Sequence, residues 1–113
     1  MLKSKIKDWW ENNLPQDAYS RKEINTREYF DEQEQKRYEI YYRYFPEILQ
    51  WDEWKGKKVL EIGCGVGTDI LQFARNGAIV TGIDLTETAI QTTKERFRVY
   101  NQSRISCLQG TYS

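Results

Sequence analysis

The sequence predicts an α/β fold built on an open parallel sheet, and three observations support this prediction. Residues 58–113 alternate short apolar runs of strand length with longer amphipathic stretches of helical length. Each helical stretch separates two apolar runs, as the crossover between parallel strands requires. Residues 1–57 have helical periodicity and no strand signal. We therefore expect a helical cap segment over residues 1–57 and an incomplete three-layer α/β sandwich over residues 58–113.

The cap segment is expected to place one aromatic face against the core. Apolar residues recur there at helical spacings, with charged residues between them. The residues of this face are Phe30, Tyr38, Tyr41, Phe45 and Ile48. Pro46 is expected to end this helix or to open a short second one that runs to Trp51.

In the second segment, turn and capping residues set the boundaries of the expected elements. The expected strands are residues 58–62, 79–83 and 104–108, and the expected helices are about 68–76 and 86–100. Gly77 suits the left-handed position after the first helix, and the Thr86 hydroxyl can cap the second. Because parallel crossovers are right-handed, we expect the strand order 3-2-1.

Composition and charge exclude several classes of protein. Lys plus Arg and Asp plus Glu number 17 each, so no net charge recruits nucleic acid or an anionic membrane. No apolar run approaches the ~20 residues of a membrane span, and no signal peptide is recognisable. The absence of His excludes a Ser-His-Asp triad, and no metal site is expected. Cys64 and Cys107 are expected to be too far apart for a disulfide, so we expect a reduced, cytoplasmic protein.

The residues that point to chemistry lie at the turn after the first expected strand. Residues 61–67 read Glu-Ile-Gly-Cys-Gly-Val-Gly, and glycines at alternate positions let a backbone bend tightly and approach a ligand. A phosphate-binding loop with Gly-Lys-Ser/Thr is absent. A dinucleotide motif G-x-G-x-x-G fails because Thr68 or Ile70 occupies its third position. The Glu61 carboxylate would also repel a pyrophosphate.

The pattern E-x-G-x-G-x-G resembles motif I of the class I S-adenosylmethionine-dependent methyltransferases. Residues 82–85, Gly-Ile-Asp-Leu, resemble the acidic second motif of that family, and residues 27–45 more loosely resemble the cap of its small-molecule methyltransferases. The resemblance implies a Rossmann-like fold and S-adenosyl-L-methionine as the cofactor. It implies that the cofactor-binding residues are Glu61, Gly63, Gly65, Gly67, Thr68, Asp84 and Leu85. Asp84 would accept both ribose hydroxyls, and Leu85 would lie against the adenine.

The resemblance further implies methyl transfer to a small-molecule acceptor, with this chain as the cofactor-binding half. Tyr29 and Tyr41 are candidates for the acceptor pocket, and a packed helix face is the alternative interpretation of these aromatics. No catalytic base is identifiable, and such transfers can depend on orientation. Two other functions stay open: an NAD(P)-dependent oxidoreductase, and a truncated fragment that only binds or interacts.

The family's sheet has seven strands in the order 3-2-1-4-5-7-6, whereas this sequence ends soon after its third strand. We therefore expect a truncated domain, without strand 4 and most of the acceptor site. The first strand would then be an apolar edge, through which we expect self-association. The acceptor, the methylated atom, the oligomeric state and the activity of the chain alone stay open.

Overall fold

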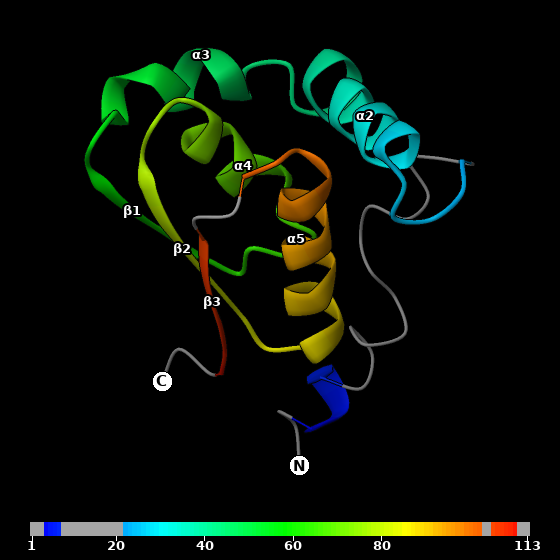
Figure 1. Cartoon of the computed structure of the whole chain (residues 1–113). Coiled ribbons are helices and arrows are strands. Elements are labelled where there is room, and N and C mark those ends of the chain that lie inside the picture. Colours follow the sequence, from blue (N-terminus) through cyan, green and yellow to red (C-terminus); the bar gives the residue numbers. More distant parts are fainter. Residues whose placement is uncertain (1–3, 8–21, 103–104, 111–113) are drawn as a thin grey trace.

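The computed structural model describes residues 4–7, 22–102 and 105–110. It contains a parallel sheet of three strands, β1 (Lys58–Ile62), β2 (Ile79–Asp84) and β3 (Ile105–Gln109), in the spatial order β1-β2-β3 (Figure 1). Both strand pairs are parallel, with Leu60 opposite Thr81 and Thr81 opposite Ser106. The predicted α/β class and the predicted strand order 3-2-1 are confirmed.

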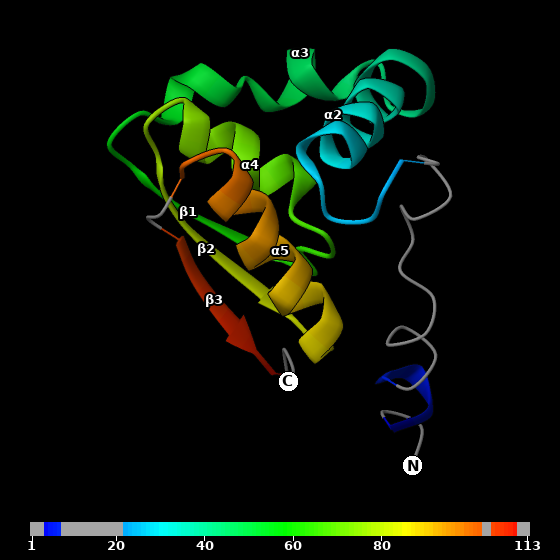
Figure 2. The same cartoon turned by 45° about the vertical axis from the view of Figure 1, so that its right-hand side comes forward.

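Helices α4 (Thr68–Arg75) and α5 (Glu87–Val99) lie on the same face of the sheet, as right-handed crossovers require (Figure 2). The capping residues act as predicted. Thr86 accepts a hydrogen bond from the backbone N–H of Ala89 at 3.1 Å, and Gly77 follows α4 in the left-handed conformation with φ 90°. The sheet and these two helices share one core with the cap, formed by Tyr29, Phe30, Ile70, Leu71, Val80, Phe97 and Tyr100.

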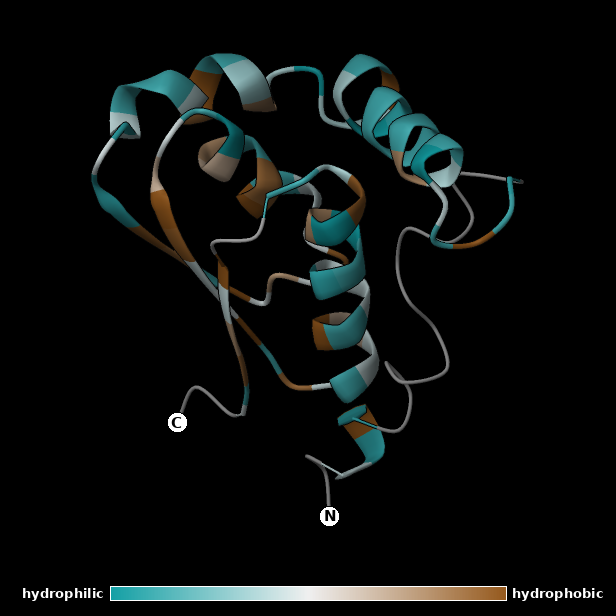
Figure 3. Ribbon diagram, viewed as in Figure 1, coloured by the Kyte–Doolittle hydropathy of each residue, from teal (hydrophilic) through white to brown (hydrophobic). Residues whose placement is uncertain are grey.

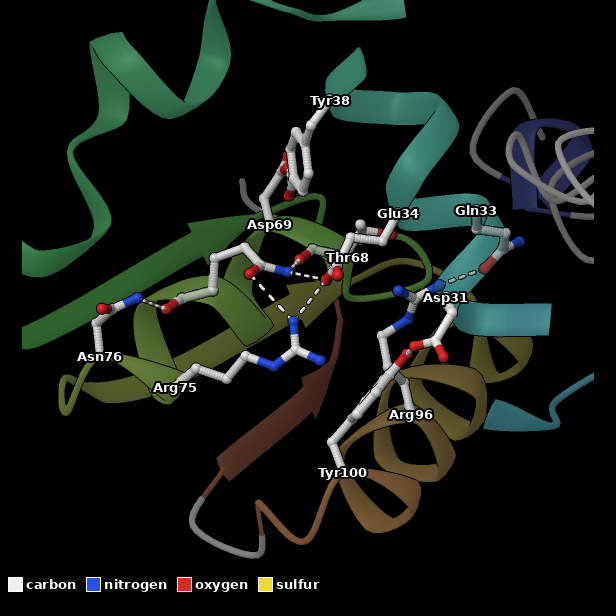
Figure 4. A network of polar contacts seen from close by, with 11 residues as sticks. Asp31, Gln33, Glu34, Tyr38, Thr68, Asp69, Arg75, Asn76, Arg96 and Tyr100 are labelled. Carbon is white, nitrogen blue, oxygen red and sulfur yellow. Dashed lines mark hydrogen bonds and ion pairs between the residues drawn. The ribbon is translucent and has the colours of Figure 1, made fainter. Parts of the chain in front are cut away.

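Between residues 22 and 57, the cap contains α2 (Arg27–Lys36), a π-helix η2 (Arg37–Tyr41), α3 (Phe45–Leu49) and a 3₁₀-helix η3 (Trp51–Trp54), whereas residues 8–21 of the predicted cap lie outside the described part of the chain. Helix α2 is mostly hydrophilic in Figure 3, and besides Tyr29 and Phe30 in the core it contacts α4 and α5 through polar side chains. Gln33 accepts a hydrogen bond from the buried Arg96 of α5, and Asp31 accepts one from Tyr100 (Figure 4).

The predicted aromatic face of the cap is wrong at two of its five positions. Phe30 is buried and Tyr38 and Phe45 are half-buried, but Tyr41 is 54% exposed and Ile48 is 67% exposed. The α-helix widens to π geometry at Arg37 and this segment ends at Tyr41, so a 3.6-residue period no longer relates the later positions. The prediction that Pro46 opens a short second helix is confirmed, because it lies in the first turn of α3.

The opposite face of the sheet is apolar. Four large side chains on it are more than half exposed: Leu60, Ile62, Ile79 and Leu108. Strand β1 is also the edge of the sheet formed by the described strands. Among the described residues, no helix combines the length and the hydropathy that a membrane crossing needs.

Candidate functional site

The glycine turn between β1 and α4 is anchored to the end of β2. The backbone N–H groups of Gly63 and Cys64 both donate to the carbonyl oxygen of Ile83, at 2.7 and 3.0 Å. Gly63, Gly65 and Gly67 all have positive φ, at 76°, 56° and 82°. Any residue with a Cβ would be strained in these conformations, so the alternating glycines are a requirement of the turn itself.

Asp84, at the carboxyl end of β2, faces this turn. Its Oδ2 accepts a hydrogen bond from the backbone N–H of Gly65 at 2.9 Å, and its Oδ1 accepts one from the N–H of Thr86 at 3.2 Å. A carboxylate offers about four acceptor positions, so Asp84 can also bind hydroxyl donors of a ligand. The structure thus brings together the glycine turn and the acid, which lie on separate strands.

Thr93 of α5 packs against the glycine turn and stabilises its geometry. Thr93 donates from its hydroxyl to the carbonyl oxygen of Gly65 at 2.9 Å. A Cβ on Gly67 would lie 2.8 Å from Cγ2 of Thr93, closer than packed carbon atoms allow. Sequence reasoning missed this role of Thr93, because nothing local relates it to a turn so far away in the chain.

Cys64 has a packing role in the turn. Its sulfur lies 3.1 Å from the position that a Cβ on Gly82 would take, so the glycine of β2 makes room for it. Burial raises the pKa of the Cys64 thiol to about 12. A thiol with this pKa stays protonated at neutral pH and is a poor nucleophile.

Glu61 is a largely buried acid at the end of β1. Its Oε1 is buried without a hydrogen-bond partner. Burial raises its pKa to about 8, and the negative charge of Asp69 adds to this rise. The positive charge of Arg37 and a hydrogen bond from the backbone of Ile70 act in the opposite direction without cancelling it. Glu61 is therefore an acid that a nearby cation would stabilise in its charged form.

The other predicted site residues lie in different environments. Thr68 is buried as the first residue of α4, and Leu85 is half-buried directly after β2. Tyr29 is 2% exposed and packs edge-on against Phe30 in the core, at 5.6 Å between ring centroids. Tyr41, in contrast, is exposed at the end of η2. The structure therefore groups the glycine turn with Asp84 and leaves Tyr29 away from any open surface.

Three further residues, Arg37, Tyr38 and Asp69, join the cap to the start of α4. The Asp69 carboxylate lies two residues after Gly67. It accepts hydrogen bonds from Nε and Nη2 of Arg37 and from the Tyr38 hydroxyl. Sequence reasoning did not connect them, because nothing local relates positions so far apart in the chain. Among the described residues, no group of three His, Cys, Asp or Glu side chains is placed to hold a metal ion.

Comparisons with known proteins point to one family. Residues 59–113 match the family model described as "Methyltransferase domain". A ubiquinone biosynthesis O-methyltransferase from Coxiella burnetii is 50% identical over 40 residues, 35% of this chain and 17% of that protein. An uncharacterized RNA methyltransferase from Protochlamydia amoebophila is 36% identical over 56 residues, 50% of this chain and 13% of that protein.

A solved structure extends the likeness to most of the chain. The PH0226 protein from Pyrococcus horikoshii OT3 matches with a TM-score of 0.58 and 25% identity, over 92% of this chain and 39% of that protein. The chain therefore spans well under half the length of these relatives. The family model starts at β1 and includes the glycine turn and Asp84. The resemblance to the class I methyltransferases that was drawn from these two motifs is confirmed, since residues 59–113 match the methyltransferase domain model and the fold is Rossmann-like.

Proposed function

We propose that this chain binds S-adenosyl-L-methionine and serves methyl transfer to a small-molecule acceptor, as the cofactor-binding half of a methyltransferase. The observation that carries the proposal is the 2.9 Å hydrogen bond from the Gly65 N–H to Asp84, which joins the glycine turn and the acid in one site. When bound, the cofactor would supply a methyl group activated by a positively charged sulfonium. The chain's own contribution is to bind and orient that group.

The residues of the site fit this cofactor on three grounds. The unpartnered Oε1 of Glu61 suits a cationic ligand, and this cofactor carries a sulfonium and an ammonium. Nothing lies within 4 Å of a Cβ position on Gly65, so the backbone is open to close approach there. Asp84 keeps acceptor capacity for a pair of ribose hydroxyls. We assign the cofactor to Glu61, Gly63, Gly65, Gly67, Thr68, Asp84 and Leu85.

A small molecule is favoured as the acceptor for two reasons. The chain has no net charge, whereas a nucleic-acid substrate is normally met by a basic surface. The curated relative with 50% identity is described as acting in ubiquinone biosynthesis, which supports a small acceptor. Tyr41 remains available for such a pocket because it is exposed, and Tyr29 could contribute only after a rearrangement of the core. We propose the division into a cap (residues 1–57) and a cofactor-binding part (residues 58–113) on the same basis.

Calorimetric titration with S-adenosylhomocysteine tests the proposal, with NADH as the competing ligand. We expect saturable binding of S-adenosylhomocysteine and none of NADH. Asp84→Asn should weaken binding about 10- to 100-fold, because hydrogen bonds to a charged acceptor contribute roughly 1.5–3 kcal/mol. Asp52→Asn, at an exposed position in η3, is the matched control and should leave the affinity unchanged. Binding of NADH, or an equal effect of both variants, would contradict the proposed function.

A further inference from the structure

Arg37 and Tyr38 of the cap together donate to both carboxylate oxygens of Asp69 in α4. Arg37 Nε donates to Oδ1 of Asp69 at 2.9 Å and Nη2 donates to Oδ2 at 2.6 Å. The Tyr38 hydroxyl donates to the same Oδ1 at 2.6 Å. Figure 4 shows the Tyr38 ring next to Asp69. We refer to Arg37, Tyr38 and Asp69 as the Asp69 clasp.

The two cap residues of the clasp begin the π-helix η2. Arg37 and Tyr38 are consecutive residues, and consecutive side chains of a regular α-helix point about 100° apart. The helix changes to π geometry at Arg37, closed by the hydrogen bond from Tyr42 N–H to the Arg37 carbonyl at 2.7 Å. The Arg37 guanidinium is also stacked 4.6 Å from the ring centroid of Tyr42. Local widening of a helix is a feature often found at functional sites.

The clasp is largely withdrawn from water, so its contacts are strong. The side chains of Arg37 and Asp69 are 13% and 12% exposed. Burial raises the pKa of Tyr38 far above its ordinary value, and the charge and hydrogen bond of Asp69 add to this rise. The Tyr38 hydroxyl therefore remains a donor at all physiological pH values. A two-pronged contact between Arg and carboxylate fixes orientation as well as distance.

The clasp acts at the end of α4 that carries the site. Asp69 lies in the first turn of α4, directly after Gly67 and Thr68, where a displacement of the helix would move the glycine turn. Its charge and that of Arg37 also act on Glu61, in opposite directions. The cap is thus connected to the candidate site both through the backbone and through electrostatics.

We propose that the Asp69 clasp is a positioning device, through which Arg37 and Tyr38 hold the start of α4 and the glycine turn in the geometry that binds the cofactor. Docking of the cap and binding of the cofactor are then coupled, so that each favours the other. This inference rests on the proposed function, and it assigns to the cap a part in cofactor affinity. Arg37, Tyr38 and Asp69 are positioning residues because they act through the glycine turn and Glu61.

The chain contains a matched control for this idea. Arg75, in the last turn of α4, forms an ion pair with Glu34 of α2 at 2.7 Å (Figure 4). This pair also joins the cap to α4, but at the end of the helix away from the glycine turn. If the clasp only stabilised the fold, breaking it and breaking the Arg75–Glu34 pair would have the same kinds of effect and would differ only in magnitude.

The experiment compares Asp69→Asn with Arg75→Gln in the full protein, by two measurements. The first is hydrogen exchange of the backbone amides of residues 64–68 without ligand, and the second is the dissociation constant of S-adenosylhomocysteine. Asp69→Asn should speed the exchange of these amides and weaken binding about tenfold, within the ~5- to 150-fold range of typical coupling between sites. Arg75→Gln should lower the melting temperature while changing both quantities less than about twofold.

Milder variants keep the test decisive if Asp69→Asn does not fold. Arg37→Lys keeps the charge and loses the fork, and Tyr38→Phe removes a single donor; both should show the same effects in smaller size. Equal effects of the clasp variants and Arg75→Gln on exchange and on affinity would overturn the inference. If the wild-type protein does not bind S-adenosylhomocysteine, the proposed function fails and the coupling to binding fails with it. If wild type binds S-adenosylhomocysteine and the clasp variants bind it equally well, the inference about the clasp is overturned and the proposed function stands.

Discussion

Glu61→Gln is predicted to stabilise the protein and to weaken cofactor binding at the same time. The pKa of Glu61 is raised from 4.5 to about 8. Burial is the main cause, and the negative charge of Asp69 is the second. Between these two values the folded protein holds a proton that the unfolded chain has lost. The free energy of unfolding therefore falls as the pH rises from about 4.5 to about 8, and below pH 4.5 Glu61 contributes no pH dependence.

The size of this effect follows from the shift of the pKa. One pH unit corresponds to about 1.4 kcal/mol, so an ionisable Glu61 destabilises the folded protein by up to about 3 kcal/mol at pH 7. Glutamine has a similar shape and no charge, so the substitution removes this penalty. We expect a gain in the free energy of unfolding that is close to zero near pH 4.5 and grows to about 3 kcal/mol at pH 7 and about 4 kcal/mol at pH 8.

Urea unfolding of wild type and Glu61→Gln at pH 4.5, 6 and 8 measures this gain. Calorimetry with S-adenosylhomocysteine in buffers of different ionisation enthalpy provides the second measurement. If the cationic ligand recruits the charged form of Glu61, wild type should release close to one proton on binding at pH 7, and the variant none. A gain in stability that is equal at all three pH values, or a loss at pH 8, would refute the reasoning on Glu61.

Three further predictions follow from the site and the sheet. Gly65→Ala and Gly56→Ala both place a Cβ at positive φ in open space, so each should lower the free energy of unfolding by about 1–2 kcal/mol. Only Gly65→Ala should also weaken the binding of S-adenosylhomocysteine that calorimetry measures. Thr93→Val should lower the free energy of unfolding by about 1 kcal/mol, because the Gly65 carbonyl loses its hydroxyl donor; an unchanged urea midpoint would show that this bond contributes nothing. We expect self-association through the apolar edge strand β1, and Leu60→Lys should decrease it. If sedimentation velocity shows that wild type is strictly monomeric, this self-association is excluded.

Much of the sheet could be predicted from the sequence because its signals are local. The strands, the capping by Thr86 and the left-handed Gly77 each depend on a few adjacent residues. The strand order followed from the handedness of crossovers, which applies to all parallel sheets. The cap was predicted less well, since helical periodicity does not reveal where an α-helix widens to a π-helix at Arg37.

The sequence by itself determined the parallel α/β architecture and the pair of motifs that ends at Asp84, because strand periodicity, glycine conformation and carboxylate chemistry are properties of short segments. Only the tertiary structure decided which side chains meet across the chain. It placed the Asp84 carboxylate on the Gly65 amide, buried an oxygen of Glu61 without a partner, and joined Arg37 to Asp69. These contacts depend on how the cap, α4 and α5 pack, and packing is fixed by the shape of the whole core rather than by the spacing of residues in any one segment.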